Sequence, residues 1–366
     1  MKKVFAVILG LGAVIIVLLL GVVFYMSHSL KKNIQDSINA QLERVHDADP
    51  SLSYQPFKCH GVKDIWCESG KVDWGDIVSL ERVRLGITDI GSKSLRIKLE
   101  SSNMTLSSKS FLGMLLGVMA PGVDFGDILF PKDIKCSIDS KLETLAKAEG
   151  AGNVENAKNP QNPINSDISC EAKANNAKYK LYIDTRENFA LEPATLESPD
   201  SLREVIFGAF EKCSNDSEAF LRDSSVLIEN ISFVMTTENL TQKIIQKLAK
   251  SENPSEQDSA KYKAQLVQSA QTMKNFIAYT MMLGNVAYKE KIIASFDHIT
   301  DMIGGVNDGI CYTLSPIDSA GRAVSLEDVL SHSKTIINPD FFTLESKGLD
   351  KSNISALESC MQNASK

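Results

Sequence analysis

The first pattern along the chain is an apolar run without charges, residues 4–26, which directly follows two lysines. At about 1.5 Å per residue, such a run is long enough to cross a bilayer core of about 30 Å as a helix. It is too long for the apolar core of a cleaved signal peptide, and no small-residue cleavage pattern follows it. We therefore expect residues 1–27 to form an uncleaved signal anchor, a single transmembrane helix.

Apolar positions then recur every three or four residues, which is the pattern of one face of a helix. They are Leu30, Ile34, Ile38, Leu42 and Val45. The ordinary interpretation is a stalk helix over residues 28–50 that continues the anchor. The alternative is that this stripe pairs with a copy of itself or with a neighbouring anchor.

From Tyr54 onward the period of the apolar positions changes from about 3.6 to 2, which is typical of strands with one buried face. The alternation covers residues 82–87, 95–100, 134–138, 168–172, 181–183, 231–235, 310–314 and 341–344. Because short turns join most consecutive strands, an antiparallel sheet with one covered face is favoured. Residues 146–166 are too polar and too rich in turn-forming residues to pack, so we expect a flexible hairpin tip there.

Helical periodicity dominates the second half of the chain. One predicted helix starts at the signal Ser198-Pro199 and carries an apolar stripe as far as Cys213. A longer pattern follows a capping box at residues 255–258 and ends at the glycine pair 304–305, with Gly284 as a candidate break. A further helix is expected from Ser325.

These patterns predict an α+β fold. We expect an N-terminal transmembrane helix, then a curved antiparallel sheet packed with amphipathic helices in an extracytoplasmic domain over residues 51–366. Two predicted strands, residues 94–106 and 226–237, are each followed by Leu-[Ser/Thr]-x-Lys and an apolar helix. This repeat raises the alternative of two related halves, residues 51–195 and 196–366.

Composition and charge narrow the class of protein. The chain has 43% hydrophobic and 23% charged residues, the balance of a globular domain with a real core. Its net charge of −7 gives no support for binding to nucleic acid or to an anionic lipid surface. The lysines before the apolar run favour a cytoplasmic N-terminus, because short basic flanks stay inside and long following domains translocate.

All seven cysteines follow the predicted anchor. An oxidising compartment would allow them to form disulfides, so we expect a single-pass protein of a bacterial inner membrane with its domain in the periplasm. Buried free thiols in a cytosolic tail are the alternative. Cys59 with Cys67 would close a short hairpin, and Cys136 with Cys170 would join the strands beside the flexible tip. A third pair, Cys311 with Cys360, would hold the C-terminus and leave Cys213 unpaired.

One short segment, residues 111–121, has no charge and no polar face, and it is too short to span a membrane as a helix. The ordinary interpretation is a buried core helix. The sharper hypothesis is that its glycines and methionines line an apolar groove together with residues of the sheet and the long helix. The candidate groove residues are Phe111, Leu112, Met114, Leu115, Met119, Phe233, Met235, Met273, Ile277 and Met281.

The candidate chemistry is thin. Cys59, His60 and Cys67 offer three ligands where structural zinc uses four at tighter spacing, so a disulfide is favoured and no metal is expected. Ser331 and Lys334 fit a Ser-x-x-Lys motif, but the partner motifs of such enzymes do not follow. Phosphate-binding and dinucleotide-binding loops do not occur in the sequence. We therefore predict no catalytic residues and no cofactor, and a protein that is not an enzyme.

The stretch from Pro56-Phe57-Lys58-Cys59 to Trp66-Cys67-Glu68, followed by alternating strands, resembles the start of certain bacterial surface lipoproteins of the adhesin type. That resemblance implies an unclosed half-barrel with an apolar concave face. The order of one anchor, then strands with apolar helices, is similar to membrane-anchored AsmA-like proteins with lipid grooves. This chain lacks the N-terminal lipidation cysteine of the lipoproteins, since its first cysteine is Cys59, and this disfavours adhesion at the cell surface.

The function that these observations predict is a membrane-anchored periplasmic binding protein, with an apolar groove for a lipid or for the apolar segment of a partner. One alternative is a structural subunit of a cell-envelope complex, which would contact an envelope protein through the stalk stripe and the long helix. The other is an adhesin-like surface protein.

Overall fold

The structure, a computed structural model, describes residues 30–61, 64–75, 78–88, 91, 93–106, 125–142, 164–189, 202, 205, 208–209, 212, 216–283, 288–317, 322–325, 339, 342–350 and 360. The predicted anchor, residues 4–26, lies outside these ranges. Among the helices inside them, none combines the length and the apolar character that a membrane span needs.

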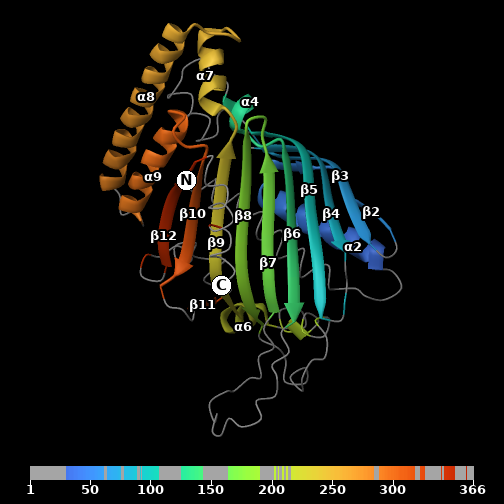
Figure 1. The fold of residues 1–366 in the computed structure, drawn as a ribbon. Coiled ribbons are helices and arrows are strands. Elements are labelled where there is room, and N and C mark those ends of the chain that lie inside the picture. Colours follow the sequence, from blue (N-terminus) through green and yellow to red (C-terminus); the bar gives the residue numbers. More distant parts are fainter. Residues whose placement is uncertain are drawn as a thin grey trace.

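The central element is one open antiparallel sheet to which twelve strands of the described residues belong (Figure 1). From β3 to β10 the strands lie side by side in chain order, with β12 added at the end. The strands are β1 (Leu52–Tyr54), β2 (Lys58–His60), β3 (Ile65–Trp74), β4 (Val78–Thr88), β5 (Ser94–Leu106), β6 (Asp133–Leu142), β7 (Ile164–Lys173), β8 (Ala177–Asn188), β9 (Ser225–Thr237), β10 (Gly309–Pro316), β11 (Arg322–Ser325) and β12 (Phe342–Leu349). The predicted α+β class with an antiparallel sheet is confirmed.

The first described helix precedes the first strand, and the other described helices are inserted between strands. They are α2 (Leu30–Ala48), α4 (Phe125–Leu129), α6 (Ser217–Asp223), α7 (Leu240–Ala249), α8 (Glu256–Leu283) and α9 (Lys289–Ile303). In Figure 1, α2 lies behind the strands at the right, and α7, α8 and α9 gather at the upper left. The helical cover is therefore split between the two ends of the sheet.

The two faces of the sheet differ because alternate residues of each strand point to opposite sides. One face carries a row of aliphatic residues that lie opposite one another on successive strands. This row is Ile65, Ile87, Ile97, Ile138, Ile168, Ile183, Ile231, Leu314 and Leu344. We call the face with this row the inner face, since its first four residues are 1–4% exposed and belong to the largest apolar cluster.

Helix α2 is part of the core. Ile34, Ile38 and Leu42 are buried in the same cluster as the inner face of β3 to β6, and each such side chain contributes about 1.5–3 kcal/mol. The predicted stripe therefore packs against the chain's own sheet, and these three residues are not available to a second copy. A helix over residues 28–50 is confirmed within the described part, residues 30–48.

Polar side chains of α2 also cover the edge of the sheet. Here β1 and β2 pair with opposite ends of β3, so they form one edge strand that is interrupted at residues 55–57. The Asn39 amide donates to the Phe57 carbonyl (3.1 Å) and accepts from the Phe57 N–H (2.8 Å). Gln35 Oε1 accepts from the Cys59 N–H at 2.9 Å. Edge groups that could pair with another chain are thus satisfied internally.

At the other end of the sheet, α7, α8 and α9 pack on one another and enclose a second apolar cluster with α4. The capping box that starts α8 is confirmed, because Ser255 Oγ accepts from the Asp258 N–H at 3.1 Å. Helix α8 ends at Leu283, next to the candidate break at Gly284, and α9 ends at the predicted glycine pair. Helix α9 also packs on β10 and β12.

The three predicted disulfides are present: Cys59–Cys67, Cys136–Cys170 and Cys311–Cys360. The first two join residues that lie directly opposite each other on neighbouring strands, with Cα–Cα distances of 3.9 and 4.0 Å. Cys311 belongs to a small apolar cluster on the outer face with Cys360. Cys213 lies outside the described residues.

One boundary of the predicted hairpin tip is wrong. Strand β7 begins at Ile164, inside the range 146–166, and Ile164 pairs with Leu142 across the sheet. Ile164 is 4% exposed, so its burial on the inner face outweighs the polar residues around it. The rest of the tip, the apolar segment 111–121 and the helix expected from Ser325 lie outside the described residues.

Candidate functional site

The inner-face row of aliphatic residues is not buried evenly. It is fully buried at β3 to β6, beside α2, and again at Leu314 of β10. Between these ends the row is half-buried, at Ile168, Ile183 and Ile231. The neighbouring inner-face residues Leu181 and Phe233 are half-buried too. We call these five residues, on β7, β8 and β9, the inner strip.

The inner strip lies between the apolar clusters of the described residues. Ile168 packs against the cluster that contains α2, and Ile231 packs against the cluster around Leu314. Leu181, Ile183 and Phe233 belong to none of the clusters formed within the described ranges. The strip is therefore apolar surface in the middle of the sheet that the described helices leave partly open.

An aromatic group borders one end of the inner strip. The ring of Phe233 lies 6.3 Å from that of Tyr179 and 6.2 Å from that of Tyr312, centroid to centroid. Both tyrosines are half-buried, and this burial raises the pKa of each hydroxyl above its usual value. The Tyr179 hydroxyl donates to the Leu129 carbonyl of α4. These neutral rings form an apolar wall at that end.

A buried polar group borders the other end. One row below Ile183, Ser166 Oγ donates to Glu187 Oε2 at 2.9 Å, and Thr185 Oγ1 donates to Oε1 at 2.6 Å. The Ser140 and Ser166 hydroxyls are 2.9 Å apart. Burial raises the pKa of Glu187 above its usual range, although the two hydroxyl donors oppose that effect. The strip thus runs from an aromatic wall to a half-buried carboxyl group.

The predicted groove residues are distributed over three places. Phe233 belongs to the inner strip. Met235 lies one row further along β9 and packs with Met273 and Ile277 of α8 in a single apolar cluster. Met281 is half-buried on α8. The other five candidates, Phe111, Leu112, Met114, Leu115 and Met119, lie outside the described residues.

Sequence reasoning missed Ile168, Leu181, Ile183 and Ile231 as site residues. Their alternation predicted the strands correctly, but it assigned every inner-face residue equally to the core. Glu187 was missed because it is a polar residue at a position of β8 where the alternation predicts an apolar one. A polar residue at such a position, at the end of an alternating segment, is the signal that could have identified it.

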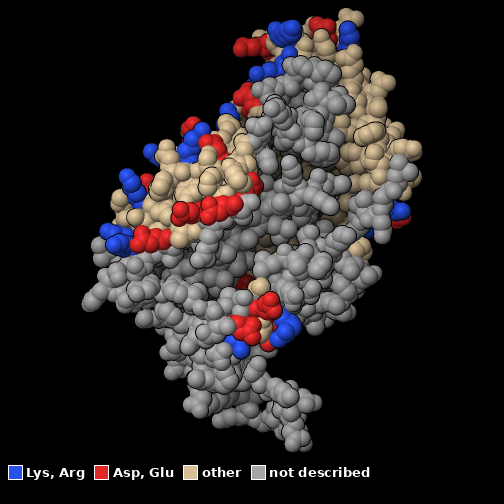
Figure 2. All heavy atoms as spheres, turned by 180° about the vertical axis from the view of Figure 1, so that it is seen from behind, with Lys and Arg blue, Asp and Glu red and all other residues tan. Residues whose placement is uncertain are grey.

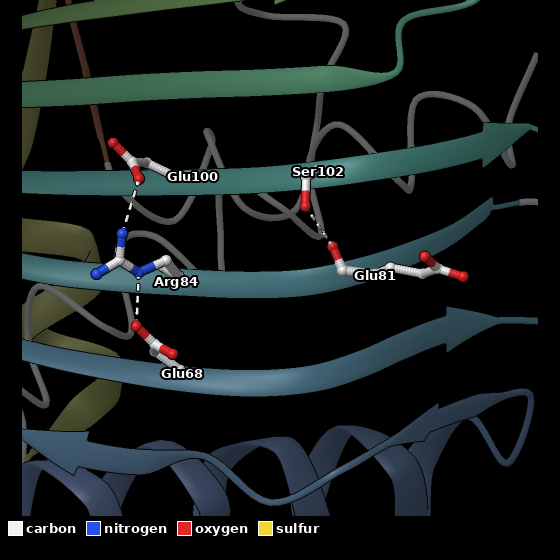
Figure 3. A network of polar contacts seen from close by, with 5 residues as sticks. All are labelled: Glu68, Glu81, Arg84, Glu100 and Ser102. Carbon is white, nitrogen blue, oxygen red and sulfur yellow. Dashed lines mark hydrogen bonds and ion pairs between the residues drawn. The ribbon is translucent and has the colours of Figure 1, made fainter.

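The outer face carries charges of alternating sign. One row across six strands consists of Glu68, Arg84, Glu100, Lys135, Glu171 and Lys180. Figure 3 shows Arg84 between its two neighbours, with Nε 2.7 Å from Glu68 and Nη1 3.5 Å from Glu100. In the same view, Ser102 Oγ donates to the Glu81 carbonyl at 3.4 Å. Because opposite charges neutralise one another along this row, it reads as stabilisation of the sheet surface rather than as a binding site.

A second outer-face row is acidic. Asp139, Asp167 and Asp184 lie opposite one another on β6, β7 and β8, and Arg96 pairs with Asp139. Partial burial, followed by the nearby carboxylates of Asp167 and Glu229, raises the pKa of Asp184 to about 6. Within the described part of the chain, no group of three His, Cys, Asp or Glu side chains is arranged to hold a metal ion.

Comparison of the chain with protein-family models, with curated proteins and with solved structures finds no match. The function of the chain is therefore inferred from the geometry of the inner strip and of the surfaces around it.

Proposed function

We propose that this chain is a membrane-anchored, extracytoplasmic binding protein that takes an apolar ligand, the acyl chain of a lipid, on the inner strip. The observation that supports the proposal is the half-buried apolar surface of Leu181, Ile183 and Phe233, which lies between two fully buried regions of the same face. An apolar surface left partly open inside a sheet is a common setting for ligand binding.

An acyl chain suits this surface better than a peptide does. Strands β7, β8 and β9 are paired on both sides, so their backbone groups have no free hydrogen bonds to offer. A peptide on the inner strip would bury its own N–H and C=O groups without partners, which costs several kcal/mol. An acyl chain has no such groups, and each buried CH₂ contributes about 0.8 kcal/mol.

The polar end of the strip fits an amphipathic ligand. A chain of about ten CH₂ groups would contribute roughly 8 kcal/mol before the cost of association is subtracted. The hydroxyls of Ser166 and Thr185 and the carboxyl of Glu187 would then lie near its polar head. A head that is neutral or cationic when bound, such as the protonated carboxyl of a fatty acid, is favoured there, because a second anion beside the half-buried carboxyl group of Glu187 is disfavoured.

The test starts from the full chain with a protease site inserted between residues 27 and 28, so that the domain folds in its membrane before release. Native mass spectrometry of the released domain is expected to show a bound lipid. A fluorescent fatty acid should then replace it and give a binding curve. No bound lipid, together with no uptake of the fatty acid at 100 micromolar, would overturn the proposal.

A pair of variants tests whether the ligand binds on the inner strip. Ile183→Gln removes apolar surface worth about 2 kcal/mol and should weaken fatty-acid binding about thirtyfold. Tyr182→Gln, the next residue on β8, lies on the outer face and should leave binding unchanged. Equal binding by the two variants would show that the ligand sits elsewhere. Circular dichroism of both proteins checks that the fold is retained.

A further inference from the structure

Helix α8 has an exposed face that no element of the described chain covers. It includes three large apolar side chains, Phe276, Tyr279 and Met282, which are 64%, 62% and 70% exposed. Four neutral polar residues continue the same face toward the start of the helix. We call the whole set the α8 seam: Gln265, Gln268, Thr272, Asn275, Phe276, Tyr279 and Met282.

The residues of the α8 seam have the spacing of helix contact positions, with the apolar residues Tyr279 and Met282 at the last two of them. Positions 265, 268, 272, 275, 279 and 282 alternate steps of three and four residues, and Phe276 flanks them. On the opposite side of α8, Leu266, Ala270 and Met273 are buried in the chain's own core. The helix therefore has one contact face that is filled and a second, regularly spaced face that is open to another helix.

The α8 seam carries no charge. Between Lys263 and the end of α8 the sequence contains one charged residue, Lys274, which is 19% exposed and pairs with Asp297 of α9. In Figure 2, where α8 lies at the upper right, charged side chains mark the top of the helical layer, and most of the described surface below them belongs to uncharged residues. A membrane-surface helix normally carries lysines and arginines beside its apolar face, so the seam fits a protein helix better than an anionic bilayer.

We propose that the α8 seam binds the α8 seam of a second copy of this chain, in parallel. The whole chain carries a net charge of −7, so two copies repel each other except where they meet through a neutral surface. In a parallel pair each residue meets its own kind, so Asn275 meets Asn275 and the two side-chain amides can hydrogen-bond to each other. An antiparallel pair would place Gln268 opposite Tyr279 and Gln265 opposite Met282, which buries amides without partners.

The size of the contact indicates a dimer that depends on the membrane. Taking about 200 Å² as the full surface of each large side chain, the exposed fractions of Phe276, Tyr279 and Met282 give about 400 Å² of apolar surface per copy. Two copies would bury about 1,000 Å² with the polar residues added, at the lower limit of stable interfaces. Anchoring in one membrane raises the effective concentration and favours such a contact.

Crosslinking of the full chain in its own membrane tests the proposal. Tyr279→Cys places a thiol on the seam, whereas Thr280→Cys places one about 100° further round the helix at another exposed site. With a short bis-maleimide, Tyr279→Cys should give at least five times more homodimer than Thr280→Cys. The parent chain sets the background from its native cysteines.

A second variant distinguishes crosslinking through a specific contact of the α8 seam from crosslinking by random collision. Met282→Glu, combined with Tyr279→Cys, places a carboxylate on the seam and should reduce the homodimer to background. Since these side chains are mostly exposed, the fold should not change, and circular dichroism checks this. Equal crosslinking by Tyr279→Cys and Thr280→Cys, a product with a different protein, or no effect of Met282→Glu would each overturn the proposal. None of these readouts depends on lipid binding at the inner strip.

Discussion

Removal of the Cys136–Cys170 disulfide should destabilise the domain more than removal of Cys59–Cys67, although both join directly opposite residues of neighbouring strands. The bonds close chain segments with sequence separations of 34 and 8 residues. The loop-entropy relation gives about 4 kcal/mol for the longer loop and about 2.5 kcal/mol for the shorter one. We therefore expect Cys136→Ala with Cys170→Ala to lose about 1 to 1.5 kcal/mol more than the matched pair of alanines at the first disulfide.

The assay is unfolding in guanidinium chloride, followed by tryptophan fluorescence. Both tryptophans, Trp66 and Trp74, lie on β3, three strands away from the longer loop's disulfide on β6 and β7. If removal of this disulfide shifts the unfolding transition reported by the tryptophans, the sheet unfolds as one unit. The reasoning fails if the double variant at the longer loop is the more stable of the two. It also fails if peptide mapping without reduction finds all seven thiols alkylated.

Three other substitutions test separate parts of the structure. The pKa of Asp184 is raised from 3.8 to about 6, so the folded chain loses stability as the pH rises through that window. Asp184→Asn should therefore add roughly 1–2 kcal/mol at pH 8 and little at pH 3.5, as urea unfolding at both values would show. Asn39→Ala leaves the N–H and C=O groups of Phe57 without their side-chain partner and should lower the free energy of unfolding by about 1–3 kcal/mol. Ile34→Ala, at a site 1% exposed, should cost about 2–5 kcal/mol in the same assay, and a loss below 1 kcal/mol would contradict the docking of α2.

Period and spacing predicted most of the described elements. The residues 82–87, whose alternation predicted a strand, lie within β4, and the residues 231–235 lie within β9. The cysteine pairs followed from the same reasoning, because two cysteines at matching positions of one hairpin meet in register. Strand β11, of four residues, and the short helix α6 carry too few residues for a period to show.

The inner strip could not have been predicted in this way. Whether Ile183 is covered depends on which helix packs over β8, and that helix can come from a distant part of the chain. The stripe of α2 shows the same limit, since its spacing predicted the helix but not its partner. Ile34 and Ile38 pack against the sheet that follows them, where the pattern alone allowed a stalk or a pairing between copies.

The docking of α2 also limits how far the domain can move from the membrane. If residues 4–26 span the bilayer as predicted, only residues 27–29 separate the span from α2. Fully extended, the chain from Met26 to Leu30 reaches about 14 Å. Asn39 and Gln35 bond α2 to the sheet, so no free arm follows this short tether. Such a protein would stay close to the bilayer surface, and a lipid that moved from this bilayer to the inner strip would not have to diffuse through water.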